Sequence, residues 1–318
     1  MLFNSLDFLV FFPLVTVLYF LLPHRFRWIH LLVASCVFYM FFIPAYILIL
    51  LFTVTLDYFA GIAIEKASGR RRKWFLVMSI AGNLGVLVVF KYGGFFTAQV
   101  NALLQVLHSP GSLPVWEIIL PIGLSFHTFQ AMSYTIEVYR GNYPAERHFG
   151  LYAVYVLFYP QLVAGPIERP AGLLRQLRER HVFDWGNLGV GLRLMLWGFF
   201  KKLVIADRLG GYVNYVYNNL DHLSSVYVVL AVVFFSFQIY CDFSGYSDIA
   251  IGAARTMGFR LVTNFDRPYF ARNIREFWAR WHISLTSWFR DYVYIPMGGN
   301  RVHWYRNILF VFLLSGLW

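Results

Sequence analysis

The hydrophobic pattern of the chain consists of long apolar runs separated by short polar segments. A bilayer core of ~30 Å requires about 20 helical residues. Apolar runs near that length therefore predict membrane-spanning helices. We expect such helices over residues 6–22, 28–43, 45–64, 74–90, 118–138, 149–167 and 226–241.

Two further segments are amphipathic. The first covers residues 188–206 and is interrupted by Lys201 and Lys202. The second covers residues 273–295, and as one helix it gathers its aromatic side chains on one face. Helices of this kind lie in the membrane interface or enter the membrane as re-entrant elements. Because no repeat or linker divides the sequence, we predict an all-α, polytopic helical bundle that forms a single multi-pass domain over residues 1–318.

Composition also indicates a membrane protein. Apolar types make up 59% of the chain and charged types 14%, whereas soluble domains carry roughly 25% charged residues. This excludes a soluble core and a disordered chain, and the two cysteines exclude a disulfide scaffold. A net charge of +11 would favour nucleic acid in a soluble protein, but here the basic residues lie between apolar runs, where they set topology. We therefore expect membrane lipid as a partner and no nucleic acid.

The basic loops predict an orientation. Arg25 and Arg27 follow the first apolar run, and five basic residues lie between positions 66 and 73, after the third run. The loop around Pro44 carries no charge. The positive-inside rule then places the two basic loops in the cytoplasm and the N-terminus outside.

The final apolar run, residues 307–318, contains 12 residues and is too short to span a bilayer. A chain that stopped there would leave helical carbonyl groups and a carboxylate uncapped in hydrocarbon. We therefore expect the domain to be incomplete at its C-terminus and the protein to continue beyond Trp318.

Polar residues inside apolar runs are expensive and often functional. For Asp57, in the third run, we favour a structural partner over a role in a site. Glu137 lies three residues before Arg140 near the end of its run, which favours an ion pair. His127 lies in the middle of the same run and fits a hydrogen-bonded core histidine at least as well as a site residue.

The segment QIYCDFSGYSDIAIG, residues 238–252, places two acids directly after an apolar run. Asp242 and Asp248 fit an acid–base pair or cation ligands, and they fit helix caps or orienting groups equally well. Spacing alone does not decide between these interpretations. Gly245 allows either a bend or the close approach of another backbone.

The segment NFDRPYFARNIREFWARWHISLTSWFRDYVYIPMGGNR, residues 264–301, is the densest in polar and aromatic side chains. As a helix, it puts His282 at the edge of the aromatic face. Partial burial there favours the neutral imidazole, which is the form that acts as a base. A histidine that only packs among tryptophans fits the same pattern, and periodicity does not separate the two.

These two segments, together with LPIGLSFHTFQAMSYTIEVYRG (residues 120–141), FYPQLVAGPIERP (residues 158–170) and the closing SGLW, resemble the membrane-bound O-acyltransferase family in its alginate O-acetylase branch. The combination is highly specific, and the resemblance runs along the whole chain. A more distant resemblance is to the D-alanyl transferases of teichoic acid synthesis. The resemblance implies a membrane O-acyltransferase that moves an acyl group, acetyl in this branch, from a cytoplasmic thioester donor across the membrane towards polysaccharide hydroxyls.

The resemblance also implies site residues. Family members carry two functional histidines, and the one in the WHIS segment corresponds to His282. The other is usually taken as the catalytic residue, follows a GLW element, and is expected directly after Trp318. Asp242 and Asn264 are secondary catalytic candidates, for orienting a histidine or contacting the acyl group. We expect no metal site.

No resident cofactor is implied, because the donor, acetyl-CoA or an acyl-carrier thioester, is a substrate. Arg175 and Arg178, which follow the GPIERP block, are candidates for binding the phosphates of the donor. Simple topology and contact with lipid headgroups are the alternative explanation for basic residues. The resemblance further implies the bacterial inner membrane, a periplasmic acetyltransferase or polysaccharide-export protein as partner, and an exopolysaccharide as final acceptor.

Two other functions fit parts of the pattern. A transporter would use Asp57, Asp242 and Asp248 as pathway acids, but it predicts inverted repeats, which we do not find in the sequence. A non-catalytic scaffold in a polysaccharide-export complex would need no histidine after Trp318.

Overall fold

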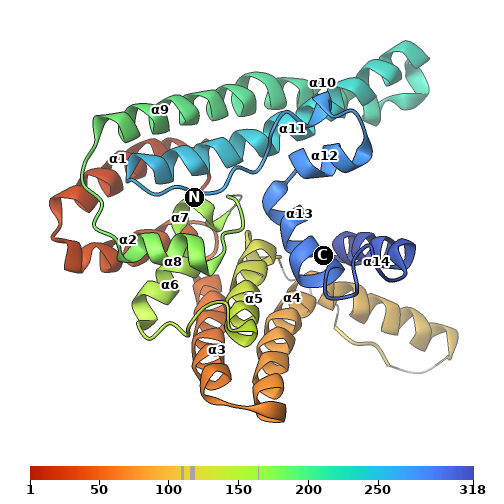
Figure 1. Cartoon of the computed structure of the whole chain (residues 1–318). Coiled ribbons are helices and arrows are strands. Elements are labelled where there is room, and N and C mark those ends of the chain that lie inside the picture. The colour runs from red at the N-terminus through yellow and green to blue at the C-terminus, as the bar shows by residue number, and fades with distance from the viewer. Residues whose placement is uncertain (109–110, 115–118, 164) are drawn as a thin grey trace.

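The computed structural model describes residues 1–108, 111–114, 119–163 and 165–318, and every regular element among them is helical (Figure 1). The predicted all-α class is confirmed. By length and composition, the helical segments able to cross a membrane are Pro44–Lys66, Gly69–Val106 and Ser225–Thr256. The expectation of seven full-length spans therefore holds for three of the apolar runs, and the others form shorter helices.

The first two apolar runs form α1 (Leu6–Leu21) and α2 (His24–Met40). The Ser5 side chain caps α1 by accepting a hydrogen bond from the Phe8 backbone N–H. In contrast, α2 starts after Pro23 with no side-chain cap, and its first turn has basic residues but no acid. The start of α2 therefore concentrates positive charge at the positive end of a helix dipole.

A bundle of three long helices follows. The 3₁₀ turn η1 (Pro44–Tyr46) leads into α3 (Ile47–Lys66), and α3 packs against α4 (Gly69–Val106). At 38 residues, α4 extends well beyond the predicted run of 74–90, at its start through the basic residues 70–73 and at its end through Val106, despite the weak helix formers Gly93 and Gly94.

The third helix of this bundle, α5 (Leu124–Arg140), lies between two glycines in the left-handed region, Gly123 and Gly141. A Cβ atom on Gly123 would lie 2.1 Å from the Leu162 carbonyl oxygen, so both the φ of +78° and the close packing require glycine there. The first residue of the predicted run 118–138 lies outside the described residues.

The predicted span over 149–167 is wrong. The chain instead forms two short helices, α6 (Phe149–Leu157) and α7 (Tyr159–Leu162), and the proline at position 160 stands in the first turn of α7. Almost every residue of both helices is buried within the protein. The apolar run therefore forms protein core and does not face lipid. The amphipathic helix α8 (Pro170–Arg178) follows and buries its leucines while exposing Arg175.

A long helical rod then crosses the molecule. It is continuous in Figure 1 and confirms the predicted amphipathic helix over 188–206. Its parts are α9 (Trp185–Phe199), the π-helical turn η2 (Phe200–Ala206) and α10 (Asp207–Asn218). The short turn η3 (Leu220–His222) leads into α11 (Ser225–Thr256), which runs back along the rod.

Glycines bring α9 and α11 into contact. A Cβ on Gly198 would lie 2.6 Å from the Gly245 carbonyl oxygen, and a Cβ on Gly191 would lie 2.6 Å from the Gly252 carbonyl oxygen. The pairs are seven residues apart on each helix, which places them on one face. The close backbone approach allowed at Gly245 is therefore present, and the helix continues through it without ending.

The C-terminal part is made of short helices. The prediction of a single helix over 273–295 is wrong, because the helix is interrupted at His282. Its elements are η4 (Pro268–Phe270), α12 (Ile274–Arg280), α13 (Ile283–Phe289), the π-helical turn η5 (Arg290–Tyr294) and α14 (Trp304–Leu317).

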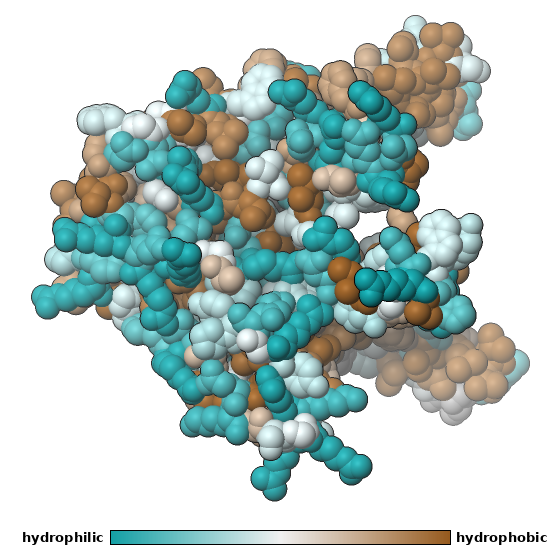
Figure 2. All heavy atoms as spheres, viewed as in Figure 1, coloured by the Kyte–Doolittle hydropathy of each residue, from teal (hydrophilic) through white to brown (hydrophobic). Residues whose placement is uncertain are grey.

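Figure 1 shows α9 and α11 along one side of the molecule and the α3–α5 bundle on the other, with α12 and α13 leading from the first group to the second. On the face in view, hydrophilic side chains gather over α8 and the α3–α4 turn, and hydrophobic ones cover the far ends of α4 and of the α10–α11 pair (Figure 2). The segment with His282 thus joins the two helical groups.

Candidate active site around His282

The interruption of the helix at His282 is stabilised by hydrogen bonds to the segment 264–266, which is distant in sequence. His282 has φ +44° and ψ +54°, a left-handed conformation that few non-glycine residues adopt. The Ile283 backbone N–H donates to the Asn264 carbonyl oxygen at 2.9 Å, and the Asp266 N–H donates to the Arg280 carbonyl oxygen at 2.9 Å. These bonds replace those that an unbroken helix would form, so they stabilise the turn.

The Asn264 side chain fixes the imidazole. Its Oδ1 accepts from the Ser284 backbone N–H at 3.2 Å and from the Ser284 hydroxyl at 2.9 Å, and it lies 3.0 Å from His282 Nδ1. Because a backbone N–H only donates, the atom that faces it must be the amide oxygen. His282 Nδ1 must therefore carry the proton, and Nε2 carries the lone pair.

The hub around Asn264 is buried. Asn264 is fully buried, and its amide nitrogen donates to the Ser247 hydroxyl of α11 at 3.2 Å. His282 is 7% exposed. Buried polar groups of this kind are stable only when they are hydrogen-bonded, and here one asparagine serves Ser247, His282 and Ser284 together. The arrangement therefore orients the imidazole rigidly.

Aromatic rings surround the imidazole of His282. The Phe243 ring lies edge-on at 4.7 Å between centroids, and the rings of Phe126 and Phe265 lie at 6.0 and 6.3 Å. His282 lies outside the three candidate spans, and its burial lowers its pKa from 6.5 to about 3. The imidazole is therefore neutral near pH 7. None of the hydrogen bonds in the described part of the chain involves Nε2 of this ring.

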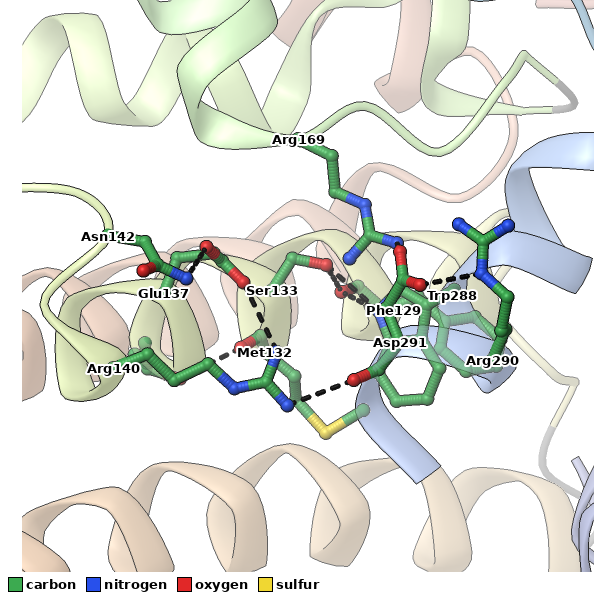
Figure 3. Close-up of polar contacts among 11 residues, drawn as sticks. Phe129, Met132, Ser133, Glu137, Arg140, Asn142, Arg169, Trp288, Arg290 and Asp291 are labelled. Carbon is green, nitrogen blue, oxygen red and sulfur yellow. Dashed lines mark hydrogen bonds and ion pairs between the residues drawn. The ribbon is translucent and has the colours of Figure 1, made fainter. Parts of the chain in front are cut away.

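Two sets of contacts anchor the helix after His282 on α5 (Figure 3). The Trp288 indole N–H donates to the Ser133 hydroxyl at 2.9 Å and to the Phe129 carbonyl at 3.1 Å. Phe129 and Trp288 also pack with ring centroids 4.4 Å apart. The α13 helix is therefore held both by a buried hydrogen bond and by aromatic packing.

The second set is an ionic cluster centred on Asp291. Arg169 and Arg290 bind its carboxylate at 3.0 and 2.7 Å, and Arg140 donates to its carbonyl oxygen at 2.9 Å (Figure 3). Arg140 also lies 3.7 Å from Glu137, which confirms the predicted ion pair. The cluster connects α5, the loop before α8 and η5.

The acids of the 238–252 segment lie in ion pairs with the π-helical turn η2. Asp242 binds Lys202 at 2.5 Å, and Lys202 also binds Asp207 at 2.8 Å. Asp248 binds Lys201 at 2.7 Å. Neither acid contacts His282 or Asn264 in the described contacts. The structure therefore brings His282 and Asn264 together but places Asp242 elsewhere, and a catalytic role for Asp242 stays a prediction.

The two arginines assigned to donor binding have different surroundings. Arg175 is exposed and pairs with Glu179 at 3.1 Å. Arg178 binds both carboxylate oxygens of the buried Glu146, at 2.5 and 2.6 Å, and lines a cavity of about 280 Å³. Arg175 does not line that cavity. Donor binding by either residue stays a prediction.

The polar residues of the α3–α5 bundle bond to one another, although His127 Nδ1 and Asn83 Oδ1 are buried without a partner among the described residues. The Asp57 carboxylate accepts from Ser79 at 2.5 Å and from Asn83 at 2.8 Å, which confirms the expected structural partner. His127 Nε2 bonds to the Thr53 hydroxyl at 2.5 Å. A site role for His127 is untested. Across the described residues, no three His, Cys, Asp or Glu side chains are grouped as metal ligands.

Comparison with known proteins decides the family. The sequence profile of the membrane-bound O-acyltransferase family matches residues 117–318. The chain belongs to this family. The resemblance expected from the motifs is thereby confirmed, and the polytopic helical architecture agrees with a family of membrane proteins.

Three relatives illustrate the range of this family. A probable alginate O-acetylase, AlgI, from Pseudomonas aeruginosa is 40% identical over the whole chain, which spans 62% of that relative. A peptidoglycan O-acetyltransferase from Helicobacter pylori is 33% identical over 91% of the chain and 59% of its own length. A teichoic acid D-alanyltransferase from Bacillus subtilis is 27% identical over 64% of the chain and 55% of its own length. The chain thus spans about three fifths of the first two relatives.

Sequence reasoning missed several residues of the hub around Asn264. Ser247 and Ser284 bond to Asn264, and Phe126 and Phe243 pack on His282. Ser284 had a local signal, because it follows His282 by two residues in the WHIS motif. The other three come from distant segments, and their contacts arise only when α5 and α11 meet the helix break.

Proposed function

We propose that the protein containing this chain is a membrane O-acyltransferase that acylates polysaccharide hydroxyls from a thioester donor. Family membership supports this reaction class, as do the names of two relatives, an alginate O-acetylase and a peptidoglycan O-acetyltransferase. The observation that carries the proposal is the neutral, oriented imidazole of His282, whose Nε2 is without a partner in the part of the chain that the structure describes.

The reaction sets two requirements for the site. The hydroxyl oxygen of the acceptor bonds to the thioester carbonyl carbon, and the carbon–sulfur bond breaks. The hydroxyl proton passes to a base and from there to the departing thiolate, so the products are an ester and a thiol. A negative charge forms on the carbonyl oxygen in between and needs hydrogen-bond donors. The site must therefore supply both an acceptor for the proton and donors for the oxyanion.

The tautomer of His282 suits the first requirement. With Nδ1–H bonded to Asn264, the neutral ring presents an acceptor at Nε2 and no donor. Such an atom accepts a hydrogen bond from the acceptor hydroxyl or from a second imidazole, but it does not stabilise an oxyanion. We therefore assign His282 to holding the reacting hydroxyl, or the base that deprotonates it, and Asn264 to positioning His282.

The second histidine of the family, expected after Trp318, fits beside this group. Trp318 stacks on Phe129 of α5 with centroids 4.0 Å apart, and His282 packs on Phe126 of the same helix. Three residues of α-helix span about 4.5 Å along the axis. A histidine directly after Trp318 would therefore begin close to the level of His282 along α5, and we assign it the role of principal base.

The donor and the direction of transfer are part of the same proposal. The basic loops after α1 and α3 support a cytoplasmic donor side, with acetyl-CoA or an acyl-carrier thioester as the donor. The acyl group then crosses to the other face of the bacterial inner membrane, where a periplasmic acetyltransferase or polysaccharide-export protein delivers it to an exopolysaccharide. Enclosing the thioester within the protein protects it from hydrolysis.

The test is acyl transfer by the product of the complete gene in proteoliposomes, with a labelled acetyl thioester inside and, outside, alginate or peptidoglycan together with a periplasmic extract of the host that supplies the delivering protein. We expect His282→Ala to lower the transfer rate by about 100-fold, because misplacing a reacting group by about 1 Å has an effect of this size. The measurement is the rate of ester formation at saturating donor.

His303 provides a matched control. It has the same residue type and nearly the same left-handed backbone, with φ +46°, but it is exposed at the start of α14. His303→Ala should retain transfer within a factor of two or so of the wild type, because surface substitutions have small effects. Equal activity of His282→Ala and wild type would refute the role of His282, and no transfer by the wild type with any thioester would refute the proposed function.

A further inference from the structure

A cavity at the start of α2 has the character of an anion-binding site. It measures about 280 Å³, far above the ~10–15 Å³ that a single water requires. Arg25, Arg27 and Arg178 line it, with Tyr19 and Trp28 between them. The residues come from α1, α2, α6, α8 and the loop after α11, so the fold builds the cavity from distant segments.

Two of the three arginines have no carboxylate partner among the described residues. Arg27 is 9% exposed and donates to the backbone carbonyls of Leu22 at 3.1 Å and His181 at 2.5 Å. Arg25 stacks over the ring of Phe26 at 4.7 Å and forms no ion pair in the described contacts. A buried guanidinium without a counterion is costly. The cavity therefore carries positive charge that the protein itself leaves unbalanced.

The third arginine, Arg178, has a carboxylate partner, Glu146. Arg178 binds both oxygens of Glu146, whose side chain is 1% exposed. This pair holds the Arg178 guanidinium at the cavity wall, and the carboxylate neutralises its positive charge. Both contacts are made by the same guanidinium nitrogen, Nη2, and charge-assisted hydrogen bonds of this kind are strong. Glu146 thus positions Arg178 but does not compensate Arg25 or Arg27.

The start of α2 adds to the positive potential in the cavity. The first turn of α2 has no acid and no side-chain cap, and it carries Arg25 and Arg27. Unbonded N–H groups and the positive end of the helix dipole favour an anion at such a position, whereas cations there are unfavourable. An anion in the cavity would therefore relieve both the helix dipole and the uncompensated arginines.

Much of the remaining lining is apolar. Leu31, Leu151, Leu177 and Phe259 belong to it, and His24 lines the cavity as well. Hydrophilic side chains gather over neighbouring α8 on the face in view (Figure 2). A ligand with an anionic head and a less polar body matches this division. We propose that the cavity binds a phosphate group, supplied either by an anionic lipid headgroup or by a soluble phosphate compound. This site is separate from the acyltransferase hub, and its test does not use acyl transfer.

The experiment measures binding to the purified protein in a neutral detergent. Its thermal midpoint is followed against increasing phosphatidylglycerol, phosphatidylcholine or inorganic pyrophosphate, because a ligand that binds only the folded state raises the midpoint. We expect phosphatidylglycerol or pyrophosphate to raise it and phosphatidylcholine to have no comparable effect. A rise with phosphatidylglycerol alone identifies a lipid headgroup, and a rise with pyrophosphate identifies soluble phosphate as a ligand.

Two variants locate the site. Arg25→Gln removes an exposed charge, and Leu177→Trp fills the cavity without changing any charge. Arg25→Gln should weaken binding of the phosphate ligand about tenfold, the size of one charge-assisted hydrogen bond, and Leu177→Trp should weaken it at least as much because the ring takes up space in the cavity. Arg70→Gln is the matched control, because Arg70 also lies in the uncapped first turn of a helix, α4, but does not line the cavity. It should bind within about twofold of the wild type.

The proposal fails if neither phosphate ligand raises the midpoint. It also fails if Arg70→Gln loses as much affinity as Arg25→Gln, because the effect would then be diffuse surface charge. Binding by Leu177→Trp at wild-type strength would equally exclude the cavity. Arg25 is exposed, so its variant keeps the test decisive if Leu177→Trp does not fold.

Discussion

Two polar regions lie on α11. One consists of charged side chains in ion pairs, and the other has no charged side chain. On the side of η2, Lys201 and Lys202 bind Asp248 and Asp242, so each charge has a counterion. On the other side, the hub around Asn264 contains no charged group, and it holds a neutral imidazole by hydrogen bonds alone. Each region contains residues that the sequence offered as candidates, Asp242 and Asp248 in the first and Asn264 and His282 in the second.

This difference indicates that the ion-paired region is structural and that the hub around Asn264 is suited to chemistry. A carboxylate that is bound to a lysine is a weaker base, because the ion pair stabilises its charged form. The imidazole of His282 has one nitrogen fixed by Asn264 and the other without a described partner. An oriented group with one unused position can bind a reactant, so the neutral hub is the better site.

The largest predicted effect comes from adding charge to the neutral hub. Burial lowers the pKa of His282 to about 3, so the imidazole stays neutral as the pH changes around 7. In Asn264→Asp a carboxylate would face Nδ1 and raise that pKa. Below the raised pKa the ring is protonated and Nε2 donates, so transfer falls as the pH drops and recovers as the pH rises. The pH profile of kcat should therefore move upward by at least about one unit.

Asn264→Ala is the companion variant. It removes the hydrogen bond without adding charge, so it should lower kcat with no comparable shift of the pH profile. If Asn264→Asp and Asn264→Ala gave the same profile, electrostatic control of His282 by this position would be contradicted. The measurement is initial rate against pH for the complete gene product in proteoliposomes.

The ion-paired region should respond in stability and not in pH profile. Lys201 is buried and Asp248 is its carboxylate partner, so Asp248→Asn leaves a buried ammonium with the Ser244 hydroxyl as its remaining partner. We expect a loss of about 3 kcal/mol of unfolding free energy. Asp242→Asn affects a half-exposed side chain and should cost at most about 1 kcal/mol. Thermal unfolding in detergent compares the two, and a larger loss for Asp242→Asn would reverse the assignment.

A smaller effect is predicted at the glycine contact that brings α9 and α11 together. Gly198→Ala would place a methyl 2.6 Å from the Gly245 carbonyl, and the helices would have to separate. We expect about 1–2 kcal/mol of destabilisation. Gly211→Ala on α10 meets no atom within 4 Å and should instead stabilise the helix by about 0.5–1 kcal/mol. A gain in stability for both variants would show that the close approach is not required.

Much of the helical framework could be predicted from hydropathy. Residues 6–22, 28–43 and 45–64 correspond closely to α1, α2 and α3, because uniform apolar runs bounded by Pro23 and Pro44 leave few alternatives. For the run 149–167, hydropathy wrongly predicted a membrane span. It is apolar because α6 and α7 are buried in protein, and hydropathy does not distinguish protein core from lipid.

The candidate site was predictable in its residues but not in its geometry. The family motifs pointed to His282 and Asn264, yet periodicity favoured an unbroken helix over 273–295. The break depends on backbone hydrogen bonds from the distant segment at Asn264–Asp266, and a local pattern contains no information about such a partner. The same limit applies to Asp242, whose lysine partner on η2 lies 40 residues earlier in the chain.

The most direct test of the central claim is the protonation state of His282. Nitrogen-15 spectra of histidine-labelled protein, with the signal assigned by its loss in His282→Gln, report which ring nitrogen carries the proton. We predict a neutral ring with the proton on Nδ1 and a bare Nε2 from about pH 5 to 8. A charged ring in that range, or a neutral ring with the proton on Nε2, would contradict the account.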